Sequence, residues 1–292
     1  MTQTVKSADG TTIAYEKSGS GPALIVIGGA FNTRKSAGNL APLLASHFSV
    51  YAYDRRGRGD STDTKPYAIE REIEDLAALI GAVGGSALVY GHSSGAVLAL
   101  LAAASGLPIT KVAAYEPPFT AEDSGSTSLE GWGENVQAAV DAGDRERAAA
   151  LFMQGTGADP AAIAGVKELP FWPGMLAIAH TLPYDIAIFG DGLAPTDRLQ
   201  NIAVPTLLIH GGNSPAWAGA AASVTAEAIP GARHVTIEGQ DHNVDPATIA
   251  PALIEFFSER FLLPRRDEWP TASVSLVRNA ASQRRLGSSE TI

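Results

Sequence analysis

Residues 87–104 read ALVYGHSSGAVLALLAAA, and this stretch decides the fold. The short apolar run at 87–90 is typical of a buried strand, and the longer apolar run after Gly95 is typical of a helix. Gly91, Ser93 and Gly95 lie between them with the Gly-x-Ser-x-Gly spacing of a sharp strand-to-helix turn. The context predicts that Ser93 lies at the tip of this turn, exposed above the carboxyl edge of a sheet.

Such a turn has a chemical use. A side chain at position 91 or 95 would collide with the neighbouring strand or helix, which explains both glycines. The Ser93 hydroxyl then projects from the sheet, and the Ser94 N–H, at the start of the helix, can donate a hydrogen bond to a developing oxyanion. The simpler alternative is an ordinary turn in which a serine caps the helix. The context favours a nucleophilic serine.

On both sides of this stretch, short apolar runs alternate with helical patterns, which predicts a sheet wound with helices. The helix expected at residues 69–82 has an apolar stripe at Ile73, Leu76, Leu79 and Ile80. After Pro117 the patterns are helical as far as about Asn201. The other expected strands are residues 12–16, 24–27, 48–53, 111–115, 205–209 and 233–238, and the later helices are 218–228 and 246–261.

With this turn and this alternation, the sequence resembles the α/β-hydrolase family from about Thr11 to Phe261. The resemblance implies a mostly parallel sheet flanked by helices, with a helical cap inserted after the sixth strand. We therefore expect a core of residues 1–116 and 202–263 and a cap of residues 117–201. Residues 264–292 are rich in Arg, Ser and Ala and show no sustained periodicity, so we expect them to form a mobile tail.

Two loops match the family in order. Gly28-Gly29-Ala30 stands where the family usually has His-Gly, so the resemblance implies only a backbone role, with the Ala30 N–H as the second oxyanion donor. Residues 54–61 (DRRGRGDS) resemble the family's Asp-x-Arg-Gly-x-Gly-x-Ser loop, which we interpret as structural. They lack the third glycine and the lysine of a phosphate-binding loop.

A nucleophilic serine needs a base, and the chain has six histidines. His242 follows the expected strand 233–238 and precedes the last helix, where the family has its catalytic histidine. His210 also ends a strand on the correct edge and is the rival candidate. His92 lies inside the turn, so its side chain should point away from the groove if Ser93 points into it.

The acid is ambiguous, because no carboxylate occurs between Asp197 and Glu227 and Ser214 stands where the family has aspartate. In some relatives, certain haloalkane dehalogenases among them, the acid follows the preceding strand, and Glu116 has that place here. Glu116 is therefore the favoured acid. Two alternatives remain. In one, Asn213 or Ser214 orients the histidine, and in the other Asp241 does so from the position just before His242.

Composition restricts the partners. The chain of 292 residues has 21 Lys and Arg against 31 Asp and Glu, a net charge of -10, which disfavours nucleic acid and anionic membranes. The absence of cysteine excludes disulfides, thiolate nucleophiles and iron–sulfur clusters.

No run approaches the about 18 apolar residues of a membrane span, and the start lacks a signal peptide, so a cytoplasmic protein is expected. No metal-ligand spacing occurs, and we expect neither metal nor cofactor. The oligomeric state stays open.

These residues predict a serine hydrolase that acts on a small-molecule substrate and cleaves a carboxylic ester or lactone with an apolar acyl or aromatic part. Ser93 would form the acyl-enzyme, His242 would carry the proton and Glu116 would orient the histidine. The alternatives on the same fold are a cofactor-free lyase or oxygenase, an acyl transferase, and a receptor-like protein with residual activity. The candidate pocket residues are Phe31, Trp172, His180 and Trp217.

Overall fold

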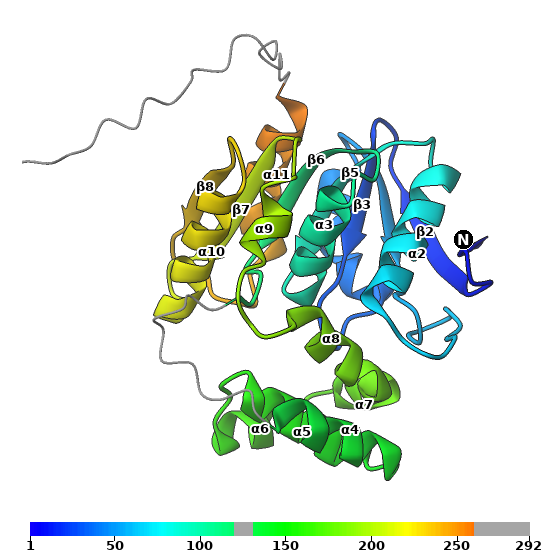
Figure 1. Ribbon diagram of the computed structural model, residues 1–292, viewed down its shortest axis with the longest axis vertical. Helices are drawn as coiled ribbons and strands as arrows, with labels where there is room; N and C mark the ends of the chain where they lie inside the picture. The colour runs from blue at the N-terminus through cyan, green and yellow to red at the C-terminus, as the bar shows by residue number, and fades with distance from the viewer. Residues whose placement is uncertain (120–130, 260–292) are drawn as a thin grey trace, which may run out of the picture. The chain divides into compact units, whose positions relative to one another are not determined.

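The centre of the molecule is an eight-stranded sheet with the order β1-β2-β4-β3-β5-β6-β7-β8 (Figure 1). The computed structural model describes residues 1–119 and 131–259. Strands β4, β3, β5, β6, β7 and β8 are parallel, whereas β2 is antiparallel to both of its neighbours. The strands are β1 Thr2–Lys6, β2 Thr12–Ser18, β3 Ala23–Ile27, β4 Ser49–Tyr53, β5 Ala87–His92, β6 Ile109–Tyr115, β7 Thr206–Gly211 and β8 Arg233–Ile237.

Helices cover both faces of the sheet. Helices α2, α3, α9 and α10 bury their apolar side chains in one cluster with one face of the sheet, and Figure 1 shows α2, α3 and α10 over this face. Helices α1 and α11 form a second cluster on the other face, beside the short helix η1. The helices are η1 Arg34–Gly38, α1 Ala41–Leu44, α2 Ile69–Ala82, α3 Ser94–Ala104, α9 Thr196–Leu199, α10 Ala216–Ala228 and α11 Pro246–Ser258.

The sequence explains these elements. Strands β4 and β5 are mostly apolar because parallel strands covered on both faces are buried along most of their length. Helix α2 buries Leu76, Leu79 and Ile80 at helical spacing, as its stripe predicts. The predicted fold class is confirmed. Strand β1 and helices η1 and α1 were not expected, and α11 ends at Ser258 rather than Phe261.

Between β6 and β7 the described elements are helical, and below we call α4 to α8 with η2 the cap. The cap has its own apolar core, which includes Val136, Phe152, Trp172 and Leu182. Its helices are α4 Trp132–Asp141, α5 Arg145–Gly155, α6 Pro160–Lys167, α7 Trp172–Ile178, η2 Ala179–Thr181 and α8 Leu182–Phe189. Helix α8 contacts α2 and α3, so it is one of the parts of the cap that meet the core.

The predicted tail, residues 264–292, lies outside the described residues. Within residues 1–119 and 131–259, no helix combines the length and the apolar character needed to cross a membrane.

Candidate active site

Ser93 lies between β5 and α3 in a strained backbone conformation, with φ 56° and ψ −125°. Its N–H donates to the carbonyl oxygen of Tyr115 over 2.9 Å. The flanking glycines are required by space: a Cβ at Gly91 would lie 2.2 Å from the Gly95 oxygen, and one at Gly95 would lie 2.4 Å from the Ile27 oxygen. The turn therefore has the geometry that the spacing of residues 91–95 predicts.

Backbone strain is concentrated at this edge of the sheet. Among the residues the structure describes, only Phe31, Ser93 and Glu116 have positive φ without being glycine, at 60°, 56° and 46°. They follow β3, β5 and β6, which are neighbours in the sheet. Strained residues of this kind persist where the surrounding structure holds them and are typical of functional sites.

His242, in the loop after β8, makes a hydrogen bond with Glu116. The His242 Nδ1 atom lies 2.7 Å from Oε2 of Glu116. Because an ionised carboxylate only accepts hydrogen bonds, Nδ1 carries the proton, and Nε2 of the neutral imidazole keeps its lone pair. In this tautomer Nε2 of His242 can accept a proton, as a general base must.

The carboxylate of Glu116 is completely buried but well supplied with donors. Its Oε1 atom accepts from the Gly211 N–H at 2.8 Å and from the Ser214 hydroxyl at 2.5 Å. Burial raises the pKa of the Glu116 carboxyl, but the hydrogen bonds from His242, Ser214 and Gly211 outweigh it, and the net pKa lies below its usual value. Ser214, found where the family has aspartate, is thus a hydrogen-bond donor to the carboxylate from the neighbouring strand.

The other acid candidates have different partners. The Asp241 carboxylate accepts from the Asn243 N–H at 2.8 Å, within its own turn, and the Asp241 carbonyl accepts from the Tyr115 hydroxyl. Asn213 joins the loop through its backbone, with its N–H donating to the Gln240 oxygen. Of the proposed acids, the structure brings Glu116 to the imidazole.

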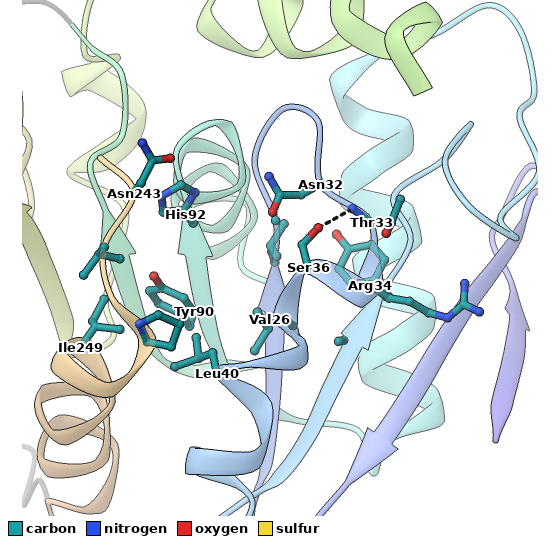
Figure 2. A pocket seen from close by; sticks show the side chains of 17 residues that line it. Val26, Asn32, Thr33, Arg34, Ser36, Leu40, Tyr90, His92, Asn243 and Ile249 are labelled. Atoms are coloured by element: carbon teal, nitrogen blue, oxygen red, sulfur yellow. Dashed lines mark hydrogen bonds between the residues drawn. The ribbon is translucent and has the colours of Figure 1, made fainter. Parts of the chain in front are cut away.

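His92 contacts the backbone of the His242 loop, and this contact was not predicted from the sequence. Its Nε2–H donates to the His242 carbonyl over 2.8 Å, and its ring stacks on Tyr115. Burial, together with the neighbouring His242, lowers the pKa of His92 to about 4, so it stays neutral. His92, with Asn32 and Asn243, lines a cavity of about 290 Å³, and the lining of this cavity includes neither Ser93 nor His242. Figure 2 shows these three side chains.

Two backbone donors lie beside Ser93. A Cβ on Gly29 would be 2.8 Å from the Ser93 Cβ, so the Gly29–Ala30 peptide packs directly against the serine. Within residues 1–119 and 131–259, neither the Ala30 N–H nor the Ser94 N–H donates a hydrogen bond. Neither N–H is therefore used by another group in these parts of the chain.

The four predicted pocket residues are placed differently. Phe31 directly follows Ala30 and packs edge-on against Phe152 of the cap, with ring centroids 5.5 Å apart. Trp172 is buried in the apolar core of the cap. His180 lies in η2 with a buried Nδ1 atom that has no hydrogen-bond partner among the described residues, and Trp217 is partly exposed in α10. Only Phe31 is adjacent to the backbone donors.

The described ranges contain no group of three or more His, Asp or Glu side chains that could hold a metal ion.

The model of the alpha/beta hydrolase family matches residues 24–278, which is most of the chain. The chain therefore belongs to the alpha/beta hydrolase family, as the resemblance predicted. The structure is similar to that of an alpha/beta hydrolase from Sphaerobacter thermophilus DSM 20745, with 53% sequence identity and a TM-score of 0.85, covering 88% of this chain and 100% of that one.

More distant proteins share the fold or part of the sequence. The enol-lactonase from Burkholderia xenovorans LB400 is 22% identical with a TM-score of 0.67, over 87% of this chain and 100% of that one, which shows a common fold. N-formylmaleamate deformylase from Pseudomonas putida is 34% identical over 119 residues, 39% of this chain and 44% of that protein. The uncharacterized hydrolase YraK from Bacillus subtilis is 33% identical over 95 residues, 31% of this chain and 35% of that protein. The alignments with these two proteins thus span less than half of their length. Family and relatives together support a hydrolytic enzyme.

Proposed function

We propose that this protein is a serine hydrolase that cleaves a carboxylic ester or lactone through an acyl-enzyme on Ser93. The observation that carries the proposal is the 2.7 Å contact between His242 and Glu116. It orients an imidazole at the same sheet edge as Ser93, which is strained and partly exposed, and these are the parts that serine nucleophile catalysis needs.

The reaction follows from the atoms. Ser93 Oγ attacks the carbonyl carbon while Nε2 of His242 takes the hydroxyl proton, and the carboxylate of Glu116 stabilises the imidazolium. The negative oxygen of the tetrahedral intermediate accepts from the Ala30 and Ser94 N–H groups. The C–O bond to the alcohol then breaks and the alcohol leaves with the proton from His242. Water repeats the sequence on the acyl-enzyme and releases the acid.

The acyl part should be apolar or aromatic. Phe31 and Ala30 pack against the apolar cluster of the cap, so the wall beside the backbone donors is apolar. The partial similarity to N-formylmaleamate deformylase adds a second test substrate, because hydrolysis of a formyl amide uses the same carbonyl chemistry.

The test is turnover of a series of p-nitrophenyl esters and lactones, with N-formylmaleamate included, combined with fluorophosphonate labelling read by mass. We expect labelling at Ser93 and loss of turnover in Ser93→Ala and His242→Ala. His234→Ala is the matched control, because His234 lies on β8 and contacts His210 rather than Glu116, and it should keep full activity. A wild-type protein that neither labels nor turns over any of these substrates would refute the proposal and favour a lyase, an oxygenase or a receptor-like protein. An added alcohol that outcompetes water would favour an acyl transferase.

A further inference from the structure

Arg58, in the loop after β4, joins the backbone beside Ser93 to the cap. Its guanidinium is 1% exposed. One end donates to the Gly29 carbonyl at 2.7 Å and to the Asn32 carbonyl at 3.3 Å. The other end donates to Oδ2 of Asp185 in α8 at 2.7 Å, and Nε donates to the Thr181 hydroxyl at 3.1 Å. A single rigid side chain thus holds two parts of the chain together.

The bond to Gly29 also determines where the Ala30 N–H points. The Gly29 carbonyl and the Ala30 N–H belong to one planar trans peptide, so they point in opposite directions. Holding the carbonyl on the guanidinium of Arg58 therefore fixes the direction of the N–H. A cationic donor on the carbonyl also polarises the peptide and makes its N–H a stronger donor.

Asp185 reaches the second backbone donor. It is completely buried, and its Oδ1 atom accepts from the Ser94 hydroxyl at 2.7 Å and from Nη1 of Arg55 at 2.7 Å. Burial raises the pKa of Asp185, but the charges of Arg58 and Arg55 and the Ser94 hydroxyl outweigh it, so the carboxyl is ionised. One cap carboxylate is therefore bonded directly to the side chain of Ser94 and, through Arg58, to the carbonyl of the peptide that carries the Ala30 N–H.

We propose that Arg58 and Asp185 are positioning residues for the oxyanion hole, and that the seating of α8 on the core completes that hole. The inference rests on the proposed function, because it requires an oxyanion between the Ala30 and Ser94 N–H groups. These N–H groups make their strongest hydrogen bonds to the substrate oxygen in the tetrahedral intermediate. Misaligning them therefore lowers kcat and leaves KM nearly unchanged.

The test compares Arg58→Lys with Arg56→Lys. Arg56 lies in the same loop, is also completely buried, and pairs with Asp75 and Asp9 at 2.8 and 2.9 Å. A lysine at 58 carries the charge but cannot bond Gly29 and Asp185 at once with the fork of a guanidinium. We expect kcat to fall about 100-fold in Arg58→Lys, the size expected for loss of one oxyanion donor, with KM within about threefold. Arg56→Lys should lose similar thermal stability and keep kcat.

Two further measurements separate positioning from folding. Asp185→Asn should also lower kcat and should weaken a boronic-acid inhibitor, whose tetrahedral adduct places an oxygen in the hole, by a similar factor. Guanidinium added to Arg58→Ala should restore part of kcat, and it should restore none in Arg56→Ala.

The outcomes distinguish the positioning role of Arg58 from the proposed serine mechanism. If Arg58→Lys keeps full kcat, or if Arg56→Lys loses as much, the positioning role is overturned while the serine mechanism stands. If the wild-type protein shows no labelling at Ser93 and no turnover, the proposed function and the positioning role fall together.

Discussion

Replacing Glu116 by glutamine is the sharpest test of whether Glu116 is the acid that orients His242. The substitution replaces one carboxylate oxygen by an NH₂ group and conserves the size of the side chain. The Gly211 N–H, which can only donate, lies 2.8 Å from Oε1. The amide oxygen of the new side chain must therefore face Gly211, and its NH₂ group must face Nδ1 of His242. Nδ1 then becomes an acceptor and Nε2 carries the proton, so the imidazole cannot take the proton of Ser93.

The size of this effect follows from the tautomer. In a Ser-His-Asp triad, an amide in place of the acid lowers kcat by about 10⁴ through the same change of tautomer. The same geometry at the His242–Glu116 contact, 2.7 Å long, implies a loss of about 10³ to 10⁴ in kcat. This corresponds to about 4 to 5.4 kcal/mol in the activation free energy.

The assay is steady-state hydrolysis of the best p-nitrophenyl ester, with the rate of fluorophosphonate labelling as a second readout. Asp241→Asn is the matched control, since this carboxylate is next to His242 in sequence but accepts from the Asn243 N–H. We expect it to keep activity within about threefold, because surface substitutions without buried partners have small effects. Full activity in Glu116→Gln, or an equal loss in Asp241→Asn, would refute the reasoning.

Three more predictions concern stability. Ser93→Gly should be more stable than Ser93→Ala by about 1 kcal/mol, because glycine relieves the strain of positive φ. Chemical denaturation of both inactive variants measures this difference, and equal denaturation midpoints would contradict it. Gly95→Ala should prevent folding or destabilise strongly, since its Cβ would lie 2.4 Å from the Ile27 oxygen, and a native-like melting temperature would show that the helix can shift. The pKa of Glu116 is lower in the folded protein than in the unfolded chain, where it is about 4.3. The ionised carboxylate therefore contributes its full share of the folding stability above the unfolded pKa, and this contribution disappears as the pH falls through the folded pKa. The difference in urea unfolding free energy between wild type and Glu116→Gln should therefore shrink below about pH 4, and a difference independent of pH would argue against an ionised carboxylate.

The fold was predictable because its signals are local. Buried parallel strands are continuous apolar runs, and α2 has a stripe at helical spacing. Strand β1 (TQTVK) was missed because it is an edge strand with mostly exposed side chains, paired to β2 through the backbone. Helix α1 has four residues, which is too short to show periodicity.

The candidate site was predictable only in part. Ser93 and His242 could be proposed from their spacing and their place in the chain, whereas the contacts of Glu116 join residues 98 and 126 positions apart. Asp185 was not proposed at all, since its partner Arg55 lies 130 positions away. A signal was present, because one carboxylate interrupts the apolar helix LPYDIAIF, and a charge that is buried needs a partner.

The contact between Ser214 and Glu116 also bears on how such a site changes during evolution. An acid that moves from one loop to another must pass through an ancestor with two acids or with none. With an aspartate at position 214, two carboxylates would meet where a hydroxyl now lies 2.5 Å from Oε1. Their repulsion would raise the pKa of one of them until it held a proton, and that proton would bridge the pair. A two-acid ancestor would therefore keep one ionised carboxylate for the histidine, and the acid could change its strand without a generation that lacked activity.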